Sequence, residues 1–293
     1  MSNIGWVGIG VMGRSMCGHL LAAGHSVRVH TRTKASAESI LAAGAKWCER
    51  PGDVAKDSEF VFTIVGYPAD VRAVYLGDGG LVDQAAPGTV LVDMTTSEPV
   101  LAGEIYHAAQ GRGIHALDAP VSGGDLGARN AALAIMVGGD QEPFERTLPL
   151  LEKMGKNIRL MGAAGAGQHT KMSNQILIAG TMIGVVESLL YAVRSGLDMD
   201  AVIDVIGSGA AGSWSINNLG RRIAKGDYDP GFFIKHFVKD MGIALSEAKK
   251  MGIALPGLAL VEQLYVGAMG QGLENMGTQA LYIALKNMSA ARE

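Results

Sequence analysis

The sequence predicts an α/β fold, with a doubly wound, mostly parallel sheet in the N-terminal part and helices alone after it. Up to about residue 161, short apolar runs alternate with helical stretches, and short loops join them. This alternation is typical of a parallel sheet with helices packed on both faces. From Gly162 onward no strand-like run remains. We therefore predict two domains, residues 1–163 and 164–293, with a long helix at about 167–194 near their boundary.

Each expected strand is a short run of apolar, often β-branched residues that ends at a glycine, a proline or a polar cluster. The continuous run at 59–65 is what a parallel strand buried on both faces requires. Gly24 and Gly252 are suited to end helices, and Asp229 before Pro230 is suited to start one. The expected strands are 4–7, 26–30, 59–65, 89–93, 114–118, 133–137 and 158–161. The expected helices are about 14–23, 69–76, 99–110, 143–154, 167–194, 199–207, 217–225, 230–251, 256–268 and 276–288.

Composition narrows the possible partners. The chain has 293 residues, 48% of them hydrophobic, with a net charge of −3. The absence of a Lys/Arg-rich run argues against nucleic acid and anionic membranes as partners, and the apolar content predicts surface hidden between subunits.

The two cysteines bear on the cellular compartment. Cys17 and Cys48 lack C-x-x-C or metal-ligand spacing, and no signal peptide is evident. We expect two reduced, buried thiols in a cytoplasmic protein.

The uncharged stretch at 172–186 raises the alternative of a membrane span. It is shorter than the roughly 20 residues that a bilayer needs, and it contains Ser173, Asn174, Gln175 and Thr181. We interpret it as a central helix of a helical domain or of an oligomer, because a helix in that position is apolar on nearly all sides.

The opening stretch of the chain carries a glycine pattern suited to phosphate. Gly8, Gly10 and Gly13 have G-x-G-x-x-G spacing, after an expected strand and before an expected helix. One glycine permits the tight turn, a second lets backbone approach a pyrophosphate, and a third lets the helix pack on the strand. An ordinary tight turn has similar composition, but the position favours a dinucleotide. The expected contacts in this loop are Gly8, Ile9, Gly10, Val11, Met12 and Gly13.

The end of the second strand bears on the choice between NAD and NADP. An NAD site usually has Asp or Glu there to bind the ribose 2′-hydroxyl, whereas here His30 and Thr31 are followed by Arg32, Thr33 and Lys34. A guanidinium binds phosphate through two parallel hydrogen bonds. We therefore predict a 2′-phosphate pocket and NADP rather than NAD, with Thr31, Arg32 and Thr33 as contacts. The alternative is a solvated turn that happens to be basic.

Three further clusters follow expected strands, where doubly wound sheets bind ligands. Thr96 could contact ribose or nicotinamide, or cap the next helix. Residues 120–124 could offer a hydroxyl and N–H groups to a carboxylate, or form a plain glycine turn. The third cluster is Val65, Gly66, Tyr67 and Pro68, all expected near the cofactor.

No metal site is expected. Asp93 and Asp118 are expected to bond local backbone rather than a metal, and the seven histidines show no ligand spacing.

Lys171 opens an otherwise uncharged helix, and Asn174 and Gln175 lie one turn later on the same face. If a substrate buries the amine, its pKa falls from about 10.4 toward neutrality, because the charged form loses solvation. The amine could then exchange a proton with a substrate oxygen. A boundary lysine that reaches solvent fits the spacing equally well. The adjacent Lys239 and Asp240, by spacing alone, indicate a solvated helix face.

Together these motifs resemble the four signatures of the β-hydroxyacid dehydrogenases. This family includes 3-hydroxyisobutyrate dehydrogenases, tartronate semialdehyde (2-hydroxy-3-oxopropionate) reductases and glyoxylate/succinic semialdehyde reductases. The matching segments are 8–13, 118–124, 165–174 and 239–240, in the family's order. The resemblance implies a Rossmann-type domain joined by a long interdomain helix to an all-α domain, usually in a homodimer or homotetramer.

The resemblance also implies a role for each matching residue. Lys171 corresponds to the catalytic lysine, and Asn174 to the first of two substrate-binding asparagines, the second of which is Gln175 here. Thr96 corresponds to the threonine near the nicotinamide. The other implied contacts are Ser122, Gly123 and Gly124 for the substrate, and Lys239 supported by Asp240 for the cofactor.

The implied reaction is reversible hydride transfer between NADP(H) and a small 3-hydroxy acid or its semialdehyde, with Lys171 as general acid/base. Glyoxylate or succinic semialdehyde reduction is an alternative. A non-catalytic NADP-binding interaction module is another, although such relatives lose the lysine that is present here. A sugar-phosphate dehydrogenase would need a basic phosphate pocket, for which Arg221 and Arg222 are the obvious adjacent pair.

Overall fold

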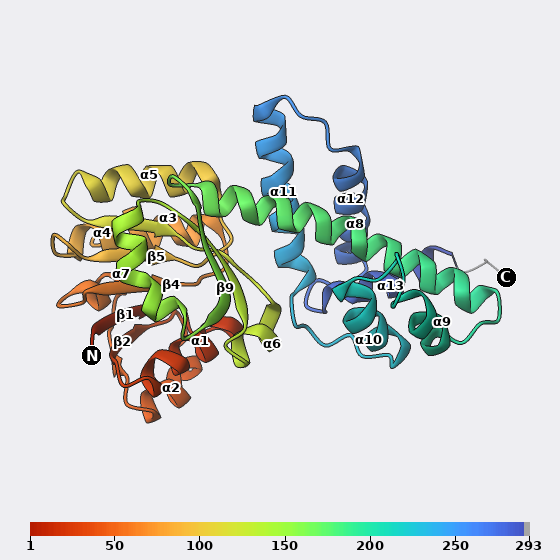
Figure 1. The fold of residues 1–293 in the computed structure, drawn as a ribbon, viewed down its shortest axis with the longest axis horizontal. Coiled ribbons are helices and arrows are strands. Elements are labelled where there is room, and N and C mark those ends of the chain that lie inside the picture. The colour runs from red at the N-terminus through yellow and green to blue at the C-terminus, as the bar shows by residue number, and fades with distance from the viewer. Residues whose placement is uncertain (290–293) are drawn as a thin grey trace. The chain divides into compact units, whose positions relative to one another are not determined.

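The computed structural model describes residues 1–289, which form two compact units, Met1–Lys171 and a second unit that begins at Met172. The first unit combines a sheet with helices, and the second is helical (Figure 1). The predicted fold class is confirmed: a doubly wound sheet comes first in the chain, and helices follow it.

The first unit is built on a nine-stranded sheet with the order β3-β2-β1-β4-β5-β6-β8-β7, and β9 pairs with β8. The strands from β3 to β6 are parallel, and the chain changes direction at β1, which has β2 on one side and β4 on the other. β8 runs antiparallel to β6 and β7. The strands are β1 (Asn3–Val7), β2 (Ser26–His30), β3 (Lys46–Trp47), β4 (Phe60–Thr63), β5 (Val90–Asp93), β6 (His115–Asp118), β7 (Val121–Ser122), β8 (Leu133–Gly138) and β9 (Gly155–Gly162).

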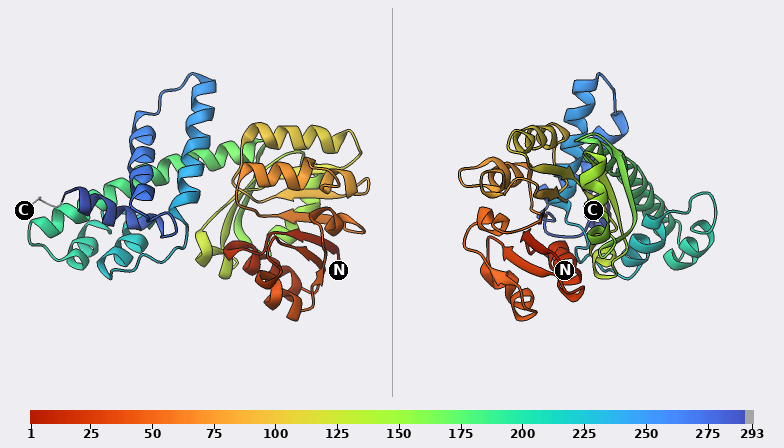
Figure 2. Two further views of the ribbon diagram at one scale, coloured as in Figure 1. Left: turned by 180° about the vertical axis from the view of Figure 1, so that it is seen from behind. Right: turned by 60° about the vertical axis from the view of Figure 1, so that its left-hand side comes forward.

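Helices cover both faces of this sheet, which Figure 2 shows from two further sides. Successive side chains of a strand point to opposite faces, so Phe60 and Phe62 join one core and Val61 joins the other. Trp6 stacks on Phe62 with ring centroids 5.7 Å apart. The helices are α1 (Val11–Ala22), η1 (Lys34–Ala37), α2 (Glu38–Ala42), η2 (Pro51–Ala55), α3 (Pro68–Leu76), α4 (Leu81–Gln84), α5 (Pro99–Gln110), α6 (Gly124–Arg129) and α7 (Gln141–Leu151).

The second unit has its own apolar core. The long helix α8 (Ala166–Arg194) begins in the first unit and contributes Met182, Val186 and Leu189 to this core. Helices α11 (Ile234–Met251) and α12 (Pro256–Gly270) pack through Phe237 and Tyr265, whose rings meet edge to face at 5.1 Å. The remaining helices are α9 (Met199–Ile206), η3 (Ser215–Gly220), α10 (Arg221–Ala224), η4 (Thr278–Ala280) and α13 (Leu281–Met288).

Of the described helices, α8 alone is long and apolar enough to span a membrane by length and composition. Its buried side chains pack as those of a core helix do, but Leu177 and Tyr191 are exposed. The helix thus contributes to the core of the helical unit as expected, and the alternative of a central helix of an oligomer stays a prediction.

The predicted helix start at Asp229–Pro230 is wrong. α11 begins at Ile234, after Phe233. Phe233 itself is extended and forms a bridge with Gly277, a tertiary contact that overrides the local capping signal. The predicted end is confirmed, since Gly252 takes the left-handed conformation with φ 69°.

Other boundaries also differ from expectation. The expected helix at 276–288 is divided into η4 and α13, and the one at 217–225 begins as the π-helical turn η3. β9 is longer than predicted because it pairs along the whole of β8. Cys17 is buried as expected, and burial raises the pKa of its thiol, but Cys48 is only half-buried.

Candidate active site

The glycine loop after β1 has the geometry that its spacing predicts. Gly8 has φ +100°, and a Cβ there would lie 2.1 Å from the Ile64 carbonyl oxygen. A Cβ on Gly13 would lie 2.1 Å from the Gly8 carbonyl oxygen, so α1 packs directly on the turn. A Cβ on Gly10 would meet nothing within 4 Å. The space over Gly10, at the N-terminus of α1, therefore fits a pyrophosphate.

The other cofactor residues predicted in the first unit follow the carboxyl ends of β2, β4 and β5, at the same edge of the sheet, which we call the carboxyl edge. Thr31 ties β2 to the glycine loop, because its Oγ1 accepts a hydrogen bond from Ile9 N at 3.3 Å. Arg32 and Thr33 are exposed just beyond it. Lys34 lies over the Trp47 ring, 5.1 Å from its centroid. This corner of the sheet is therefore basic and exposed.

A buried hydrogen-bond network fixes the turn after β5. Asp93 Oδ1 accepts from Thr63 Oγ1 at 2.9 Å and from Thr95 N at 3.0 Å. Thr95 Oγ1 in turn accepts from Val65 N at 3.0 Å, which links this turn to residues 65–68. Burial raises the pKa of Asp93 to about 6. Thr95 is thus a structural residue, and the half-buried Thr96 is the next one along the turn.

The loop after β7 is shaped by two glycines. Ser122 is half-buried and pairs with Ala134 in the ladder to β8. Gly123 and Gly124 follow with φ +130° and +61°, conformations that L side chains rarely adopt. The loop therefore needs glycine at both positions, and its composition follows from backbone geometry.

Asp118 at the end of β6 holds the start of α8. Its Oδ1 accepts from Gly165 N at 2.7 Å and its Oδ2 from Gln168 N at 2.8 Å. The expectation of a backbone partner is confirmed, but these partners are 47 and 50 residues away in the chain, so the expectation that they are local is wrong. Burial raises the pKa of this carboxyl. Lys171 follows on the same helix with a relative exposure of 6%. The alternative of a boundary lysine that reaches solvent is wrong.

A second polar cluster lies in the helical unit. Asn174 Nδ2 donates to Gln175 Oε1 at 2.7 Å, and Gln175 Nε2 donates to Asp240 Oδ2 at 2.6 Å. Lys239 Nζ is 3.1 Å from Asp240 Oδ1, and only 12% of its side chain is exposed. The interpretation of Lys239 and Asp240 as a solvated face is therefore wrong. Gln175, where the family has asparagine, is long enough to reach Asp240.

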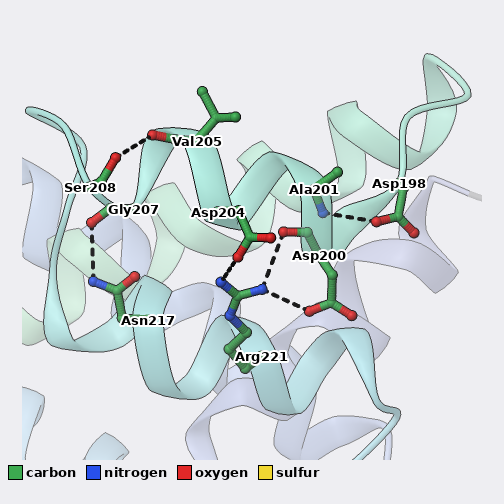
Figure 3. A network of polar contacts seen from close by, with 9 residues as sticks. All are labelled: Asp198, Asp200, Ala201, Asp204, Val205, Gly207, Ser208, Asn217 and Arg221. Atoms are coloured by element: carbon green, nitrogen blue, oxygen red, sulfur yellow. Dashed lines mark hydrogen bonds and ion pairs between the residues drawn. The ribbon is translucent and has the colours of Figure 1, made fainter.

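The arginine pair of the helical unit is occupied by carboxylates. Figure 3 shows the Arg221 guanidinium between Asp200 and Asp204 of α9, with both of which it forms ion pairs. Arg222 pairs with Asp227 at 2.7 Å and lowers the pKa of that carboxyl to about 2. These contacts tie α10 to α9 and to the following loop, so the pair does not provide the basic pocket that a sugar phosphate needs.

Sequence reasoning missed Gln168, a fully buried side chain that bonds to the turn after β5. A polar residue early in a helix gives no sign of a partner about 70 positions away. Across residues 1–289, no three His, Cys, Asp or Glu side chains gather as a metal site would require.

The fold and this edge of the sheet define an oxidoreductase that uses a nicotinamide dinucleotide. A model of the NAD binding domain of 6-phosphogluconate dehydrogenase matches residues 3–162. A model of the NAD-binding region of NADP-dependent 3-hydroxyisobutyrate dehydrogenase matches residues 165–285. The chain belongs to the β-hydroxyacid dehydrogenase family, and it acts on the CH–OH group of hydroxyacids or on the corresponding carbonyl.

Individual relatives are similar over nearly their whole length. An uncharacterised oxidoreductase of Bacillus subtilis, YkwC, is 54% identical over 96% of this chain and 97% of its own. The probable 3-hydroxyisobutyrate dehydrogenase-like 1 of Arabidopsis thaliana is 52% identical over 98% of this chain and 86% of its own. A structure of Mycobacterium tuberculosis 3-hydroxyisobutyrate dehydrogenase with L-serine has a TM-score of 0.88 at 30% identity, covering 98% of this chain and 99% of that one.

Proposed function

We propose that this enzyme transfers hydride between NADP(H) and a small 3-hydroxy acid or its semialdehyde, with Lys171 as general acid/base. The observation that carries the proposal is the burial of Lys171 at the start of α8, at 6% exposure. The helix start is bonded to the ends of β5 and β6 through Gln168 and Asp118. These bonds attach the first turn of α8, three residues before Lys171, to the carboxyl edge that also carries the glycine loop, and this supports the assignment.

In the oxidising direction, the amine of Lys171 takes the proton of the substrate hydroxyl, and the carbinol becomes a carbonyl. Nicotinamide, when bound, supplies the acceptor for the hydride of the carbinol carbon. In the reducing direction the Lys171 ammonium returns the proton to the carbonyl oxygen. A lysine that is buried at the start of the helix can exchange this proton with a bound substrate oxygen and not with bulk water.

The substrate carboxylate is assigned to the loop after β7. The Ser122 hydroxyl and the N–H groups of Gly123 and Gly124 are donors of the kind that binds an anion. Asn174, on the face of α8 that carries Lys171, is proposed to bind substrate. Gln175 is buried and bonded to Asp240, so we propose that it supports Asn174.

NADP is proposed as the preferred cofactor because Arg32 and Thr33 follow β2 where an NAD site usually has a carboxylate. The match to a model named for an NADP-dependent enzyme is consistent with this choice. Replacing Arg32 with alanine should raise KM for NADPH at least tenfold and change KM for NADH less than threefold. The control is Arg72→Ala, which removes an arginine from the exposed pair with Glu104. Equal effects on both cofactors would contradict the assignment.

The substrate is best assigned by a turnover panel in both directions. NADP⁺ and NAD⁺ are used with 3-hydroxyisobutyrate, L-serine, glycerate and 4-hydroxybutyrate, and NADPH and NADH with glyoxylate and succinic semialdehyde. The 3-hydroxy acids should react fastest, since the proposal is for that class. Reduction of glyoxylate or succinic semialdehyde as the fastest reaction would favour the alternative substrates. Tight NADPH binding with no turnover on any compound would favour a non-catalytic module.

The cytoplasmic location and the homodimer or homotetramer stay predictions from the sequence, as does the absence of nucleic-acid and membrane partners. Sedimentation of the full chain tests the oligomer. A monomer at micromolar concentration would show that the apolar composition has another cause.

A further inference from the structure

Gln168 connects the helix that carries Lys171 to the turn that carries Thr96. Its side chain is fully buried, with 0% exposure. The amide oxygen Oε1 accepts a hydrogen bond from Ser97 N at 2.9 Å, and Nε2 donates one to the Thr95 carbonyl oxygen at 2.7 Å. These two hydrogen bonds hold the backbone of the residues immediately before and after Thr96.

The partners determine the orientation of this amide. The backbone N–H of Ser97 requires an acceptor, and the carbonyl of Thr95 requires a donor. Turning the amide over would set donor against donor and oxygen against oxygen. A glutamine is therefore the neutral side chain of this length that satisfies both groups.

The backbone of Gln168 is fixed as firmly as its side chain. Gln168 N donates to Asp118 Oδ2 at 2.8 Å. Just before it, a Cβ on Gly167 would lie 2.4 Å from the Met136 carbonyl oxygen and 2.7 Å from that of Asp118. The first turn of α8 is thus pressed against the sheet, and Lys171 follows three residues later on the same helix face.

We propose that Gln168 is a positioning residue, which sets the distance between the turn that carries Thr96 and the amine of Lys171. The inference rests on the proposed function, in which the same carbinol loses its hydride near Thr96 and its proton to Lys171. Both transfers need their partners in place at once, and a misplacement of about 1 Å costs on the order of 100-fold in rate.

The first test removes both hydrogen bonds while nearly keeping the volume of the side chain. Gln168→Met should lower kcat about 10- to 100-fold and leave KM for cofactor and substrate within about threefold. The control is Thr147→Val, which removes a buried hydrogen bond from Thr147 Oγ1 to the Pro143 carbonyl oxygen at 2.7 Å in the same unit. The control should lose stability but not kcat. A kcat of Gln168→Met equal to that of the control would overturn the proposal.

The second test uses protonation to restore the bonds. In Gln168→Glu the ionised carboxylate accepts from Ser97 N but sets a negative oxygen against the Thr95 carbonyl. The protonated acid offers one acceptor and one O–H donor, the same pattern as glutamine. The kcat ratio of Gln168→Glu to wild type should therefore rise as pH falls from 8.5 to 5.5, and the ratio for Gln168→Met should stay flat. A flat ratio for the glutamate variant would contradict the hydrogen-bond argument.

Amide hydrogen exchange separates this inference from the proposed function. In the full-length protein, the Ser97 amide should exchange at least tenfold faster in Gln168→Met than in wild type or Thr147→Val, because its acceptor is gone. If wild type turns over no hydroxy acid although Ser97 exchange responds, the proposed function fails and the link between turn and helix stands. Unchanged exchange at Ser97 would refute the link whatever the activity.

Discussion

Asp93 offers a quantitative test of the buried network under the proposed nicotinamide site. The carboxyl group lies at the end of β5, opposite Asp118 of β6 in the parallel register. Its Oδ1 takes both hydrogen bonds, from Thr63 and from Thr95. Asp93→Asn keeps an oxygen at that position and removes the ionisable group, so the variant isolates the electrostatic contribution of the buried carboxylate.

Burial raises the pKa of Asp93 from 3.8 to about 6, and the neighbouring Asp118 adds to the shift. Between pH 3.8 and about 6, this carboxyl is protonated in the folded protein and ionised in the unfolded chain. The stability that it contributes is therefore fully present below pH 3.8 and is lost as pH rises through 6. A shift of about two units corresponds to about 3 kcal/mol. Asp93→Asn should match wild type near pH 4 and be about 3 kcal/mol more stable at pH 7.5.

Urea unfolding at a series of pH values, followed by tryptophan fluorescence, measures this difference. Trp6 is fully buried in the first unit, stacked on Phe62, so its emission reports on the unit that contains Asp93. Asp78→Asn replaces an exposed carboxyl of the same unit and serves as the matched control. A stability difference that stays constant from pH 4 to 7.5, or a variant less stable than wild type at pH 7.5, would refute the reasoning.

Two further predictions concern the glycine loop and the helical unit. Gly13→Ala should destabilise the first unit by about 1–3 kcal/mol, because its methyl would meet the Gly8 carbonyl, whereas Gly10→Ala should fold normally and weaken NADPH binding. Unfolding curves and cofactor titration check this pair, and equal stabilities would contradict the packing argument. Gln175→Asn should cost about 1.5–3 kcal/mol, since the shorter side chain loses the buried bond to Asp240. Circular dichroism during unfolding measures it, and an unchanged midpoint would contradict a stabilising role for the bond between Gln175 and Asp240.

Features that depend on local geometry could be predicted from the sequence. The glycine loop is an example, because the tight turn, the packing of α1 and the open space over Gly10 each need glycine at a fixed spacing. The parallel sheet could be predicted for the same reason, since continuous apolar runs such as that at 59–65 suit strands that are covered on both faces. The end of α11 at Gly252 depends only on a left-handed residue.

Features that depend on distant partners could not be predicted in this way. Asp229 and Pro230 have the composition of a helix start, but Phe233 forms a bridge with the distant Gly277 and the helix begins only after it. Gln168 bonds to a turn more than 70 residues earlier. From the spacing of charges alone, Lys239 is predicted to lie on a solvated helix face. Its side chain is buried by tertiary packing, which no local sequence pattern encodes.

The most direct test of the account is the turnover of Lys171→Ala with NADPH and the preferred semialdehyde, measured beside the dissociation constant for NADPH. The account predicts that kcat falls by at least about 100-fold, as loss of a general acid should cause, while NADPH binds within about threefold of wild type. A variant that binds NADPH and keeps the wild-type kcat would contradict the assignment of Lys171 as the proton donor.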